Sequence, residues 1–364
     1  MNSAAKCSGK RSSLFLVNSV STRASISVTL LNLMAFSFNF TIQAETGELP
    51  GEEQTFEKEN GHSTRTEEHG SAPKQPKEAK EHGAPRDPAA LLANAVPETL
   101  SIGALPPLRH LNEFVFEQTA PEREDDEAIL SQTIGQHSDL ISGVYEGGLK
   151  VWECTYDLLD YLEQEGETFS GKRVLDLGCG AGLLGLLALK RGASRVHFQD
   201  YNSTVIEQLT VPNVLLNCDY DDDDDDDSDE EKDGKHGSPP SKKRALDLAP
   251  PPDMARCRFF SGDWTSFLPL LLSEKPPPKY DMILTSETIY NTSYYKALHD
   301  VFEQLLANNG VVYLSTKSHY FGVGGGLHLF ETFVVQRNVL EVKRLKDIET
   351  GLQRHVVSLR FKKS

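Results

Sequence analysis

From Lys172 to the C-terminus, short apolar runs alternate with longer stretches in which apolar residues recur every three or four positions. The short runs are rich in β-branched, leucine and aromatic residues and predict buried strands, whereas the longer stretches predict helices. Strands that alternate with helices are joined by right-handed crossovers, which produces a mostly parallel sheet covered on both faces. The predicted strands are Arg173–Leu177, Arg195–Asp200, Cys257–Ser261, Tyr280–Thr285, Val311–Thr316, Leu340–Leu345 and His355–Phe361. The predicted helices are Gly182–Arg191, Ser203–Asn217, Thr265–Leu272, Ser293–Ala307 and Leu327–Arg337.

This pattern predicts a seven-stranded, Rossmann-like α/β fold, in which ligands bind beyond the carboxyl ends of the strands. Only a short polar stretch containing Gly351 separates the last two strands, so we expect an antiparallel hairpin at the edge of the sheet. Upstream, Tyr145–Gln164 reads as one amphipathic helix and Pro88–Ala95 as a shorter helix.

Two segments lack the apolar residues that a core requires. Gln43 to about Pro88 is rich in Glu, Lys, Gly, Pro and Ser, and Cys218–Ala255 contains a run of aspartates followed by glycines and prolines. Both are predicted to be disordered, because they cannot bury enough surface to offset the entropy of ordering. We therefore expect residues 34–130 to be mostly disordered with short ordered pieces, such as a strand at Met34–Ile42. Residues 131–364 then form the folded domain, with the acidic insertion at residues 218–255.

Residues 1–33 contain no acidic residue, are rich in serine and carry Lys6, Lys10, Arg11 and Arg23. This composition is typical of an organelle transit peptide. The alternative is an in-frame extension upstream of a start at Met34. Composition alone leaves both open.

The net charge of −17 is concentrated in one place, because residues 219–233 hold twelve acids and one lysine. Outside that stretch, 36 basic residues face 42 acidic ones, and we expect no direct binding of nucleic acid through phosphates. No apolar stretch approaches the length of roughly 18 residues that a membrane helix needs, so we expect no membrane contact. The five cysteines are scattered without a C-x-x-C pair, which predicts neither a disulfide framework nor a metal site.

The run Val174-Leu175-Asp176-Leu177-Gly178-Cys179-Gly180-Ala181-Gly182 ends a predicted strand and opens a helix. Its glycines let the backbone approach a ligand closely, and the helix start offers unpaired N–H groups. The dinucleotide pattern G-x-G-x-x-G is not met, because Leu183 stands at the third glycine position. Asp176 at the strand end would repel a pyrophosphate but suits the sulfonium and ammonium groups of S-adenosylmethionine. The stretch predicts a methyl-donor site and argues against a nicotinamide-dependent oxidoreductase.

Polar residues follow the next two strands. Asp200 ends the second strand, where an acid binds ribose hydroxyls in nucleotide folds, and Gln199 and Tyr201 flank it; the alternative is a helix cap. Asp263 and Trp264 follow the third strand and suit the amine and the ring of adenine; the alternative is a core tryptophan beside a capping aspartate.

Thr285–Asn291 follows the fourth strand, where methyltransferases place residues around the transferring methyl. The sequence N-P-P-Y, which grips amino nitrogens of adenine or glutamine, is absent, which argues against methylation of nucleic-acid amines. Gly322–Gly326 is interpreted as a lid or as a plain turn, and His319 as a general base or as a structural residue.

Together these stretches resemble the protein-histidine methyltransferases. The resemblance extends from about Met34 to the C-terminus, and Met34–Phe40 looks like the N-terminus of that family, which favours the extension reading of residues 1–33. It implies a class I methyltransferase that uses S-adenosylmethionine and forms tele-methylhistidine in a large-ribosomal-subunit protein. It also implies a place in the cytoplasm, nucleus and nucleolus and an effect on ribosome biogenesis or translation. The resemblance is carried by His137–Thr155, Val174–Gly180, Phe198–Asn202, Gly262–Trp264, Thr285–Asn291 and His319–Gly326. The implied donor contacts are Val151, Trp152, Glu153, Cys154, Thr155, Gly178, Gln199, Asp200, Tyr201, Gly262, Asp263, Trp264 and Ser286, and the glycine turn adds Asp176 and Gly180.

Methyl transfer to imidazole needs no strong base, because its ordinary pKa of about 6.5 leaves much of it neutral at pH 7. We expect catalysis by positioning and water exclusion, with Glu287, Tyr290 or Asn291 orienting the ring. Two alternatives remain: a lysine methyltransferase of the same superfamily, and a non-catalytic chaperone of ribosomal protein that retains donor binding. The basic cluster Lys242–Arg244 is interpreted as contacting an import receptor, or as charges that balance the acidic run.

Overall fold

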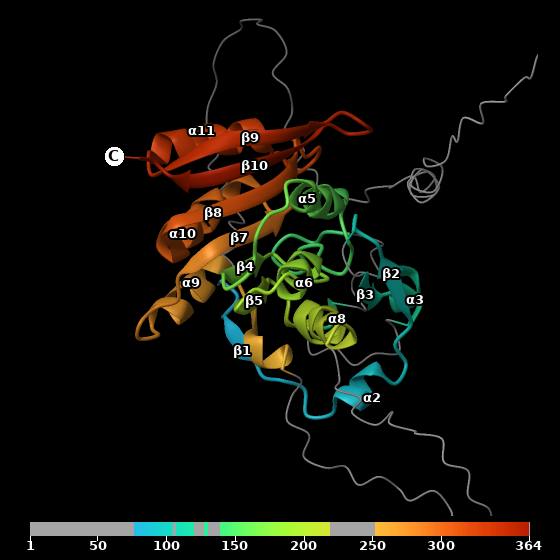
Figure 1. The fold of residues 1–364 in the computed structure, drawn as a ribbon. Coiled ribbons are helices and arrows are strands. Elements are labelled where there is room, and N and C mark those ends of the chain that lie inside the picture. The colour runs from blue at the N-terminus through green and yellow to red at the C-terminus, as the bar shows by residue number, and fades with distance from the viewer. Residues whose placement is uncertain (1–75, 105–106, 120–126, 130–138, 219–251, 364) are drawn as a thin grey trace, which may run out of the picture. The chain divides into compact units, whose positions relative to one another are not determined.

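The computed structural model describes residues 76–104, 107–119, 127–129, 139–218 and 252–363 (Figure 1). The predicted strand Met34–Ile42, residues 1–33 and most of the acidic insertion with Lys242–Arg244 lie outside the described residues. No helix within these ranges combines the length and the apolar character that crossing a bilayer demands.

The centre of the described chain is an eight-stranded sheet with the order β1-β6-β5-β4-β7-β8-β10-β9. The five strands from β6 to β8 are parallel, and β1, β10 and β9 are antiparallel to their neighbours. The chain reverses its direction of travel across the sheet beside β4, which is the switch point where α/β sheets bind ligands. The strands are β1 (Lys80–His82), β4 (Arg173–Leu177), β5 (Arg195–Asp200), β6 (Cys257–Ser261), β7 (Tyr280–Ser286), β8 (Leu306–Lys317), β9 (Leu340–Ile348) and β10 (Arg354–Phe361).

Helices cover both faces of the sheet (Figure 1). One face carries α5 (Glu153–Gln164), α6 (Leu183–Lys190) and the series α7 (Ser203–Val205), η2 (Ile206–Thr210) and α8 (Val211–Leu216). The other face carries α9 (Trp264–Leu272), α10 (Tyr295–Leu305) and α11 (Leu327–Arg337). Short elements complete the described chain: α2 (Pro88–Leu92), β2 (Pro97–Leu100), β3 (Leu108–Leu111), α3 (Glu113–Thr119), η3 (Met254–Arg256) and η4 (Thr292–Tyr294).

The two faces follow from the period of two along each strand, since successive side chains point to opposite sides of a sheet. Val174 packs with α5 and α6, whereas the next residue, Leu175, packs with α9 and α10. Met282 and Ile283 divide in the same way in β7. Both faces of the central strands are buried, which is why their sequences read as continuous apolar runs.

Most predicted elements are confirmed, including the strands β4, β5 and β6, the helix α11 and the C-terminal antiparallel hairpin. The predicted count of seven strands is wrong, because β1 adds an eighth strand on the β6 edge. This strand lies in the segment predicted to be disordered up to Pro88, so that prediction is wrong at its end. Its three residues are polar, and they are held by the backbone of β6 and by side-chain contacts that no local pattern reveals.

Two helix predictions also need correction. The helix predicted to begin at Tyr145 begins at Glu153, because Gly147 and Gly148 form a turn and Trp152 has an extended backbone with φ −85° and ψ 153°. The helix predicted at Ser203–Asn217 contains a π-helical turn, Ile206–Thr210, followed by Pro212. Thr210 Oγ1 in this turn donates a hydrogen bond of 2.7 Å to the carbonyl oxygen of Gly180. The irregular helix therefore supports the glycine turn.

Candidate functional site

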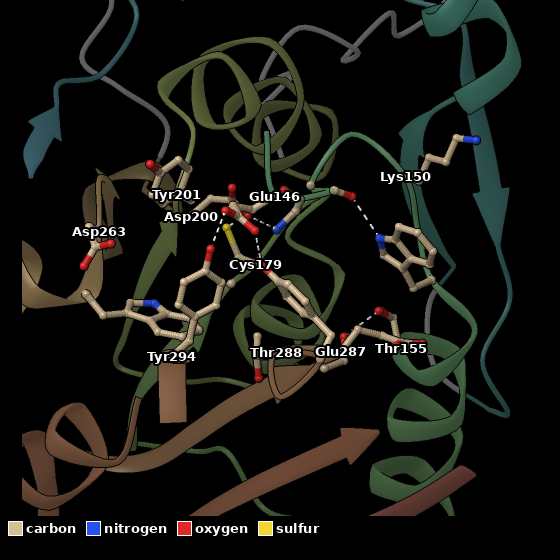
Figure 2. A pocket seen from close by; sticks show the side chains of 18 of the residues that line it. Glu146, Lys150, Thr155, Cys179, Asp200, Tyr201, Asp263, Glu287, Thr288 and Tyr294 are labelled. Atoms are coloured by element: carbon tan, nitrogen blue, oxygen red, sulfur yellow. Dashed lines mark hydrogen bonds between the residues drawn. The ribbon is translucent and has the colours of Figure 1, made fainter. Parts of the chain in front are cut away.

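A cavity of about 330 Å³ opens at the carboxyl ends of β4, β5, β6 and β7 (Figure 2). Asp200 and Glu146 lie near its centre, Asp263 and Tyr294 on one side, and Thr155 and Glu287 on another. Its size and its mixture of aromatic and polar walls are those of a small-molecule site. Most of the predicted donor contacts line it: Val151, Trp152, Thr155, Gly178, Gly180, Asp200, Tyr201, Gly262, Asp263, Trp264 and Ser286.

The glycine turn after β4 forms the floor of the cavity. Gly178 has a φ of +65°, a conformation that residues with a side chain rarely adopt. A Cβ at this position would also lie 2.6 Å from Cγ2 of Thr288 in the loop after β7. The turn and the β7 loop therefore approach each other more closely than any residue but glycine allows.

Asp200 at the end of β5 faces the cavity. Its Oδ2 accepts a hydrogen bond of 3.0 Å from the N–H of Gly180, and its Oδ1 accepts one of 3.2 Å from the N–H of Asn202. Burial raises the pKa of Asp200 to about 6, although these backbone hydrogen bonds act in the opposite direction. The carboxylate thus joins the glycine turn to the β5 end, at the position that binds ribose hydroxyls in this type of fold.

Trp264 and Gln199 form one hydrogen-bonded unit at the cavity wall. The indole Nε1 of Trp264 donates a hydrogen bond of 2.8 Å to Oε1 of Gln199, and the Gln199 amide donates to the carbonyl oxygens of Asp200 and Gly262. Gln199 is fully buried and does not line the cavity as predicted, so it holds Trp264 in place from behind.

Asp263 lines the cavity and also caps α9. Its Oδ1 accepts hydrogen bonds of 2.7 Å from the backbone N–H and from the hydroxyl of Thr265. The capping reading of Asp263 is therefore confirmed, and its contact with the adenine amine stays a prediction.

Asp176 stands in β4 as predicted, but its side chain does not face the cavity. Its carboxyl group is 1% exposed, is not part of the cavity wall and accepts a hydrogen bond of 2.8 Å from the N–H of Gly185 in α6. Burial raises its pKa to about 8, so the carboxyl group is largely protonated at pH 7. Asp176 therefore does not line the cavity as predicted: its side chain points under the turn and holds the start of α6.

The entry to α5 divides its residues between the cavity and the core. Thr155 Oγ1 lies 2.7 Å from Ser286 Oγ, which joins α5 to the end of β7 at the cavity wall. Trp152 Nε1 donates a hydrogen bond of 2.8 Å to the carbonyl oxygen of Gly147. Glu153 and Cys154 do not line the cavity; Cys154 is fully buried, and burial raises the pKa of its thiol well above the usual range.

Glu287 is held beside a buried cation. Its backbone has a φ of +59°, a strained value for a residue with a side chain, and its Oε1 lies 3.2 Å from Nζ of Lys317. Lys317 is 3% exposed and also lies 3.9 Å from Glu153 and 5.4 Å from the ring centre of Trp152. Strain of this kind persists only where surrounding contacts enforce it, and it gathers at functional sites.

Sequence reasoning missed an acid that gathers two tyrosines, Glu146. Its carboxylate accepts hydrogen bonds from the hydroxyls of Tyr290 and Tyr294 and one of 2.6 Å from the N–H of Gly143. Burial and the Glu146 carboxylate together raise the pKa of Tyr290 well above its usual range. Glu146 does lie in the segment that carries the family resemblance. No local pattern, however, linked it to Tyr290 and Tyr294, which follow it in the chain by 144 and 148 positions.

Asn291 does not belong to the cavity wall. Its Oδ1 accepts hydrogen bonds from the backbone N–H and the hydroxyl of Ser293, and Asn291 is thereby the N-cap of η4. The prediction that Asn291 orients a substrate is therefore wrong. His319 is exposed and packs on Phe321, away from the cavity lining.

Gly322–Gly326 forms a turn packed against the β7 loop. The N–H of Gly325 donates a hydrogen bond of 2.8 Å to the carbonyl oxygen of Tyr290. A Cβ at Gly325 would lie 2.3 Å from backbone atoms of Ile289 and Tyr290. This stretch therefore supports the loop that carries Tyr290 from behind.

A parallel sheet with this order, a glycine turn after β4 and an acid at the end of β5 define a class I α/β methyltransferase. Residues 153–353 match the family model described as "Methyltransferase domain". The chain is 50% identical over 288 residues to the histidine protein methyltransferase 1 homolog of Bos taurus, a match that covers 79% of this chain and 73% of that protein. The corresponding protein of Mus musculus is 46% identical over 287 residues, covering 79% and 75%. That of Dictyostelium discoideum is 40% identical over 238 residues, covering 65% and 63%. The chain belongs to the histidine protein methyltransferase 1 family.

The methyl donor of such an enzyme is S-adenosylmethionine, and the cavity residues fit its parts. Trp264 offers an aromatic wall for adenine, and Asp200 offers acceptors for ribose hydroxyls. The glycine turn, Thr155 and Ser286 also line the cavity, and the amino-acid part of the donor would lie against them.

Proposed function

We propose that this enzyme methylates the tele nitrogen, Nε2, of a histidine in a protein of the large ribosomal subunit. Family membership supports histidine as the acceptor, and the ribosomal substrate rests on the resemblance described for the sequence. One structural observation carries the chemistry: the Glu146 carboxylate and the Tyr290 hydroxyl form a fixed pair in the cavity wall, beside the strained loop of Glu287.

S-adenosylmethionine supplies an electrophilic methyl group, and the acceptor supplies the lone pair of a neutral imidazole. The protein then has to hold one ring nitrogen toward the methyl and the other toward a hydrogen-bond acceptor, because the second nitrogen carries the proton. Glu146 with Tyr290 offers such an acceptor, and Tyr294 and Trp264 pack edge to face at 6.4 Å beside it. Positioning and exclusion of water are the main contributions to the rate.

The pair formed by Glu287 and Lys317 has a different part in this proposal. Because Lys317 neutralises the carboxylate, Glu287 shapes the β7 loop that presents Tyr290 and does not act as a base. We therefore expect Glu287→Gln to weaken catalysis through the position of Tyr290.

The test is incubation of the purified chain with labelled S-adenosylmethionine and ribosomal proteins, followed by mass-spectrometric mapping of the modified residue. Wild type is compared with Tyr290→Phe, and Asn291→Ala serves as the matched control from the same loop. The expected result is a label on the tele nitrogen of one histidine, reduced by about 10²-fold in Tyr290→Phe, the usual weight of a positioned catalytic group. Label on lysine would show the alternative lysine activity. Donor binding without any transfer would favour the non-catalytic chaperone.

The same proposal includes a place of action in the cytoplasm, nucleus and nucleolus. A fluorescent fusion of the full chain checks it, and signal confined to another organelle would contradict it. Fusing residues 238–247 alone to the reporter tests the basic cluster: a cytosolic signal would contradict its reading as a contact for an import receptor.

A further inference from the structure

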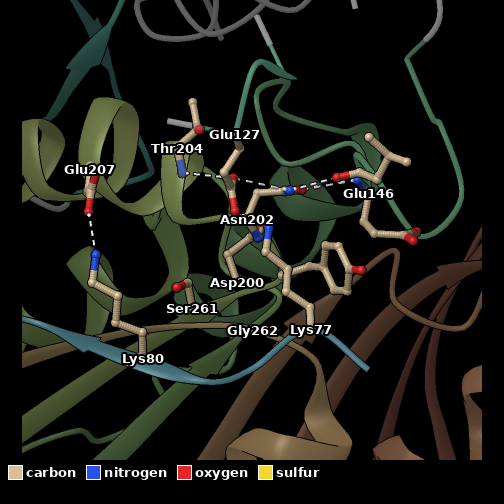
Figure 3. Close-up of polar contacts among 12 residues, drawn as sticks. Lys77, Lys80, Glu127, Glu146, Asp200, Asn202, Thr204, Glu207, Ser261 and Gly262 are labelled. Carbon is tan, nitrogen blue, oxygen red and sulfur yellow. Dashed lines mark hydrogen bonds and ion pairs between the residues drawn. The ribbon is translucent and has the colours of Figure 1, made fainter. Parts of the chain in front are cut away.

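The segment Pro76–His82, here named the N-terminal strap, runs along the outer edge of β6 and past its carboxyl end (Figure 3). Pro76 lines the cavity. The carbonyl oxygen of Lys77 accepts a hydrogen bond of 3.0 Å from the N–H of Asp263 and one of 2.6 Å from the hydroxyl of Ser266. The strap therefore touches the same β6–α9 corner that carries Asp263 and Trp264.

The far end of the strap is anchored on both faces of the sheet. His82 is 7% exposed; its Nδ1 lies 2.8 Å from Oε1 of Glu207, and its Nε2 lies 2.8 Å from Oγ of Ser261. Glu81 points the other way and receives two hydrogen bonds, of 2.8 and 2.9 Å, from Arg258. Strand pairing and these contacts together fix β1 along β6.

Backbone of the strap also rests directly on a glycine of the cavity wall. Gly262 has a φ of +118°, and a Cβ built there would lie 2.6 Å from Cα of Ala79 and 2.6 Å from the carbonyl oxygen of Glu78. A side chain at position 262 would lift the strap away. Gly262 is therefore needed for the close packing of the strap, in addition to its predicted contact with the donor.

The Lys77 side chain extends the connection toward the centre of the cavity. Its ammonium pairs with Glu127 and lies 4.8 Å from the ring centre of Tyr201, which lines the cavity. Glu127 accepts hydrogen bonds from Thr204 and Asn202, and Asn202 accepts one of 3.3 Å from the N–H of Glu146 (Figure 3). One polar network thus runs from the strap to the loop that holds Tyr290 and Tyr294.

We propose that the N-terminal strap is part of the donor site: it closes the cavity over the adenosine end of the donor, and its docking and donor binding favour each other. The physical reason is that residues 77–82 hold four parts of the wall at once: Asp263, Gly262, Tyr201 and, through Glu127 and Asn202, the Glu146 loop. A wall that is already assembled loses less entropy when the donor binds, so affinity is higher with the strap docked. Linkage requires the converse, that donor binding stabilises the docked strap. This inference rests on the assignment of the cavity to the methyl donor and is independent of which residue accepts the methyl.

The first test measures binding of S-adenosylhomocysteine to the full chain by calorimetry. The variant Lys77→Ala/His82→Ala removes two side-chain anchors of the strap, neither of which lines the cavity. We expect its Kd to rise about tenfold, from the loss of hydrogen bonds to charged partners that help to assemble the wall. Lys80→Ala is the matched control on the same strand, because its side chain is 62% exposed and reaches Glu207 only at 3.5 Å. A Kd equal to that of Lys80→Ala would overturn the proposal.

Two further measurements separate a role in binding from a role in folding. Ser266→Ala removes one hydrogen bond to the strap from outside the cavity, and we expect a rise in Kd of about threefold, one neutral hydrogen bond. With the proposed acceptor, these variants should show a higher KM for the donor at an unchanged kcat. A fall in kcat with unchanged KM would count against the proposal. If no acceptor is methylated at all, the proposed function fails while the binding measurement still decides the role of the strap.

Hydrogen exchange on the full-length wild type tests the converse. We expect S-adenosylhomocysteine to slow exchange at the amides of residues 77–82, with no change in β9 at the opposite edge of the sheet. Unchanged exchange in the strap at saturating S-adenosylhomocysteine would overturn the coupling.

Discussion

The contact between the glycine turn and the β7 loop can be tested with Gly178→Ala. An alanine Cβ would lie 2.6 Å from Cγ2 of Thr288, whereas carbon atoms in contact lie at about 3.5–4.0 Å. Thr288 cannot simply rotate away, because its Oγ1 lies 2.8 Å from Oγ1 of Thr285, which donates in turn to the carbonyl oxygen of Leu177. The turn or the loop must therefore move.

Two terms give the size of the effect. A φ of +65° costs an alanine about 1–2 kcal/mol, and forcing an extra carbon into a packed site costs about 1–3 kcal/mol. We expect Gly178→Ala to lower the free energy of unfolding by about 2–5 kcal/mol in total. Thr288→Ser removes Cγ2 but keeps the hydroxyl, so in that background only the backbone term of about 1–2 kcal/mol should remain.

Urea unfolding followed by tryptophan fluorescence measures both backgrounds, since both tryptophans of the chain, Trp152 and Trp264, line the cavity. The donor Kd provides a second readout, because the turn forms the cavity floor and its displacement changes the shape of the donor site. An equal cost of Gly178→Ala with Thr288 and with Ser at position 288 would refute the reasoning, since the two sites would then be independent.

Three other outcomes follow from the site. Burial raises the pKa of Asp200 to about 6, and ribose binding uses the ionised carboxylate. Donor affinity measured by calorimetry should therefore fall as the pH drops through about 6. The same pH dependence in Asp200→Asn would contradict this. Burial raises the folded-state pKa of Asp176 to about 8, above the ordinary value of about 3.9, so its stabilising contribution is complete below pH 4 and is lost as the pH rises toward 8. Asp176→Asn keeps an oxygen for the N–H of Gly185, and its gain in urea midpoint over wild type should be larger at pH 9 than at pH 5; an equal difference at both pH values would count against a buried charge. Asn291→Ala should lose about 1 kcal/mol of stability as a lost cap while keeping its single-turnover rate, and a slower rate at unchanged donor affinity would restore a catalytic role for Asn291.

Local pattern was sufficient for most of the fold and for the donor side of the site. The strands β4, β5 and β6 begin and end where the apolar runs do, because a strand buried on both faces needs a continuous apolar sequence. Gly178, Asp200 and Trp264 stand at strand ends, and the ends of parallel strands meet at one edge whatever the details of packing.

The same pattern gave wrong predictions for residues near the cavity whose side chains could point either into the cavity or into the surrounding structure. Asp176 stands at a strand end like Asp200, yet it turns beneath the helix start, where burial raises the pKa of its carboxyl group to about 8. Asn291 follows β7 as Tyr290 does, yet it caps η4. Sequence position places such residues near the cavity, but the packing around each side chain decides whether it faces the cavity.

By itself, then, the sequence determined the α/β sheet, the glycine turn and the edge at which the donor binds, because these depend on periodicity within about ten residues. Tertiary structure alone decided the strap at Pro76–His82 and the gathering of Tyr290 and Tyr294 on Glu146. Both depend on contacts between residues more than a hundred positions apart in the chain. Such contacts depend on the shape and the burial of the whole fold. The polar segments that make them have no periodic pattern of apolar residues from which the contacts could be predicted.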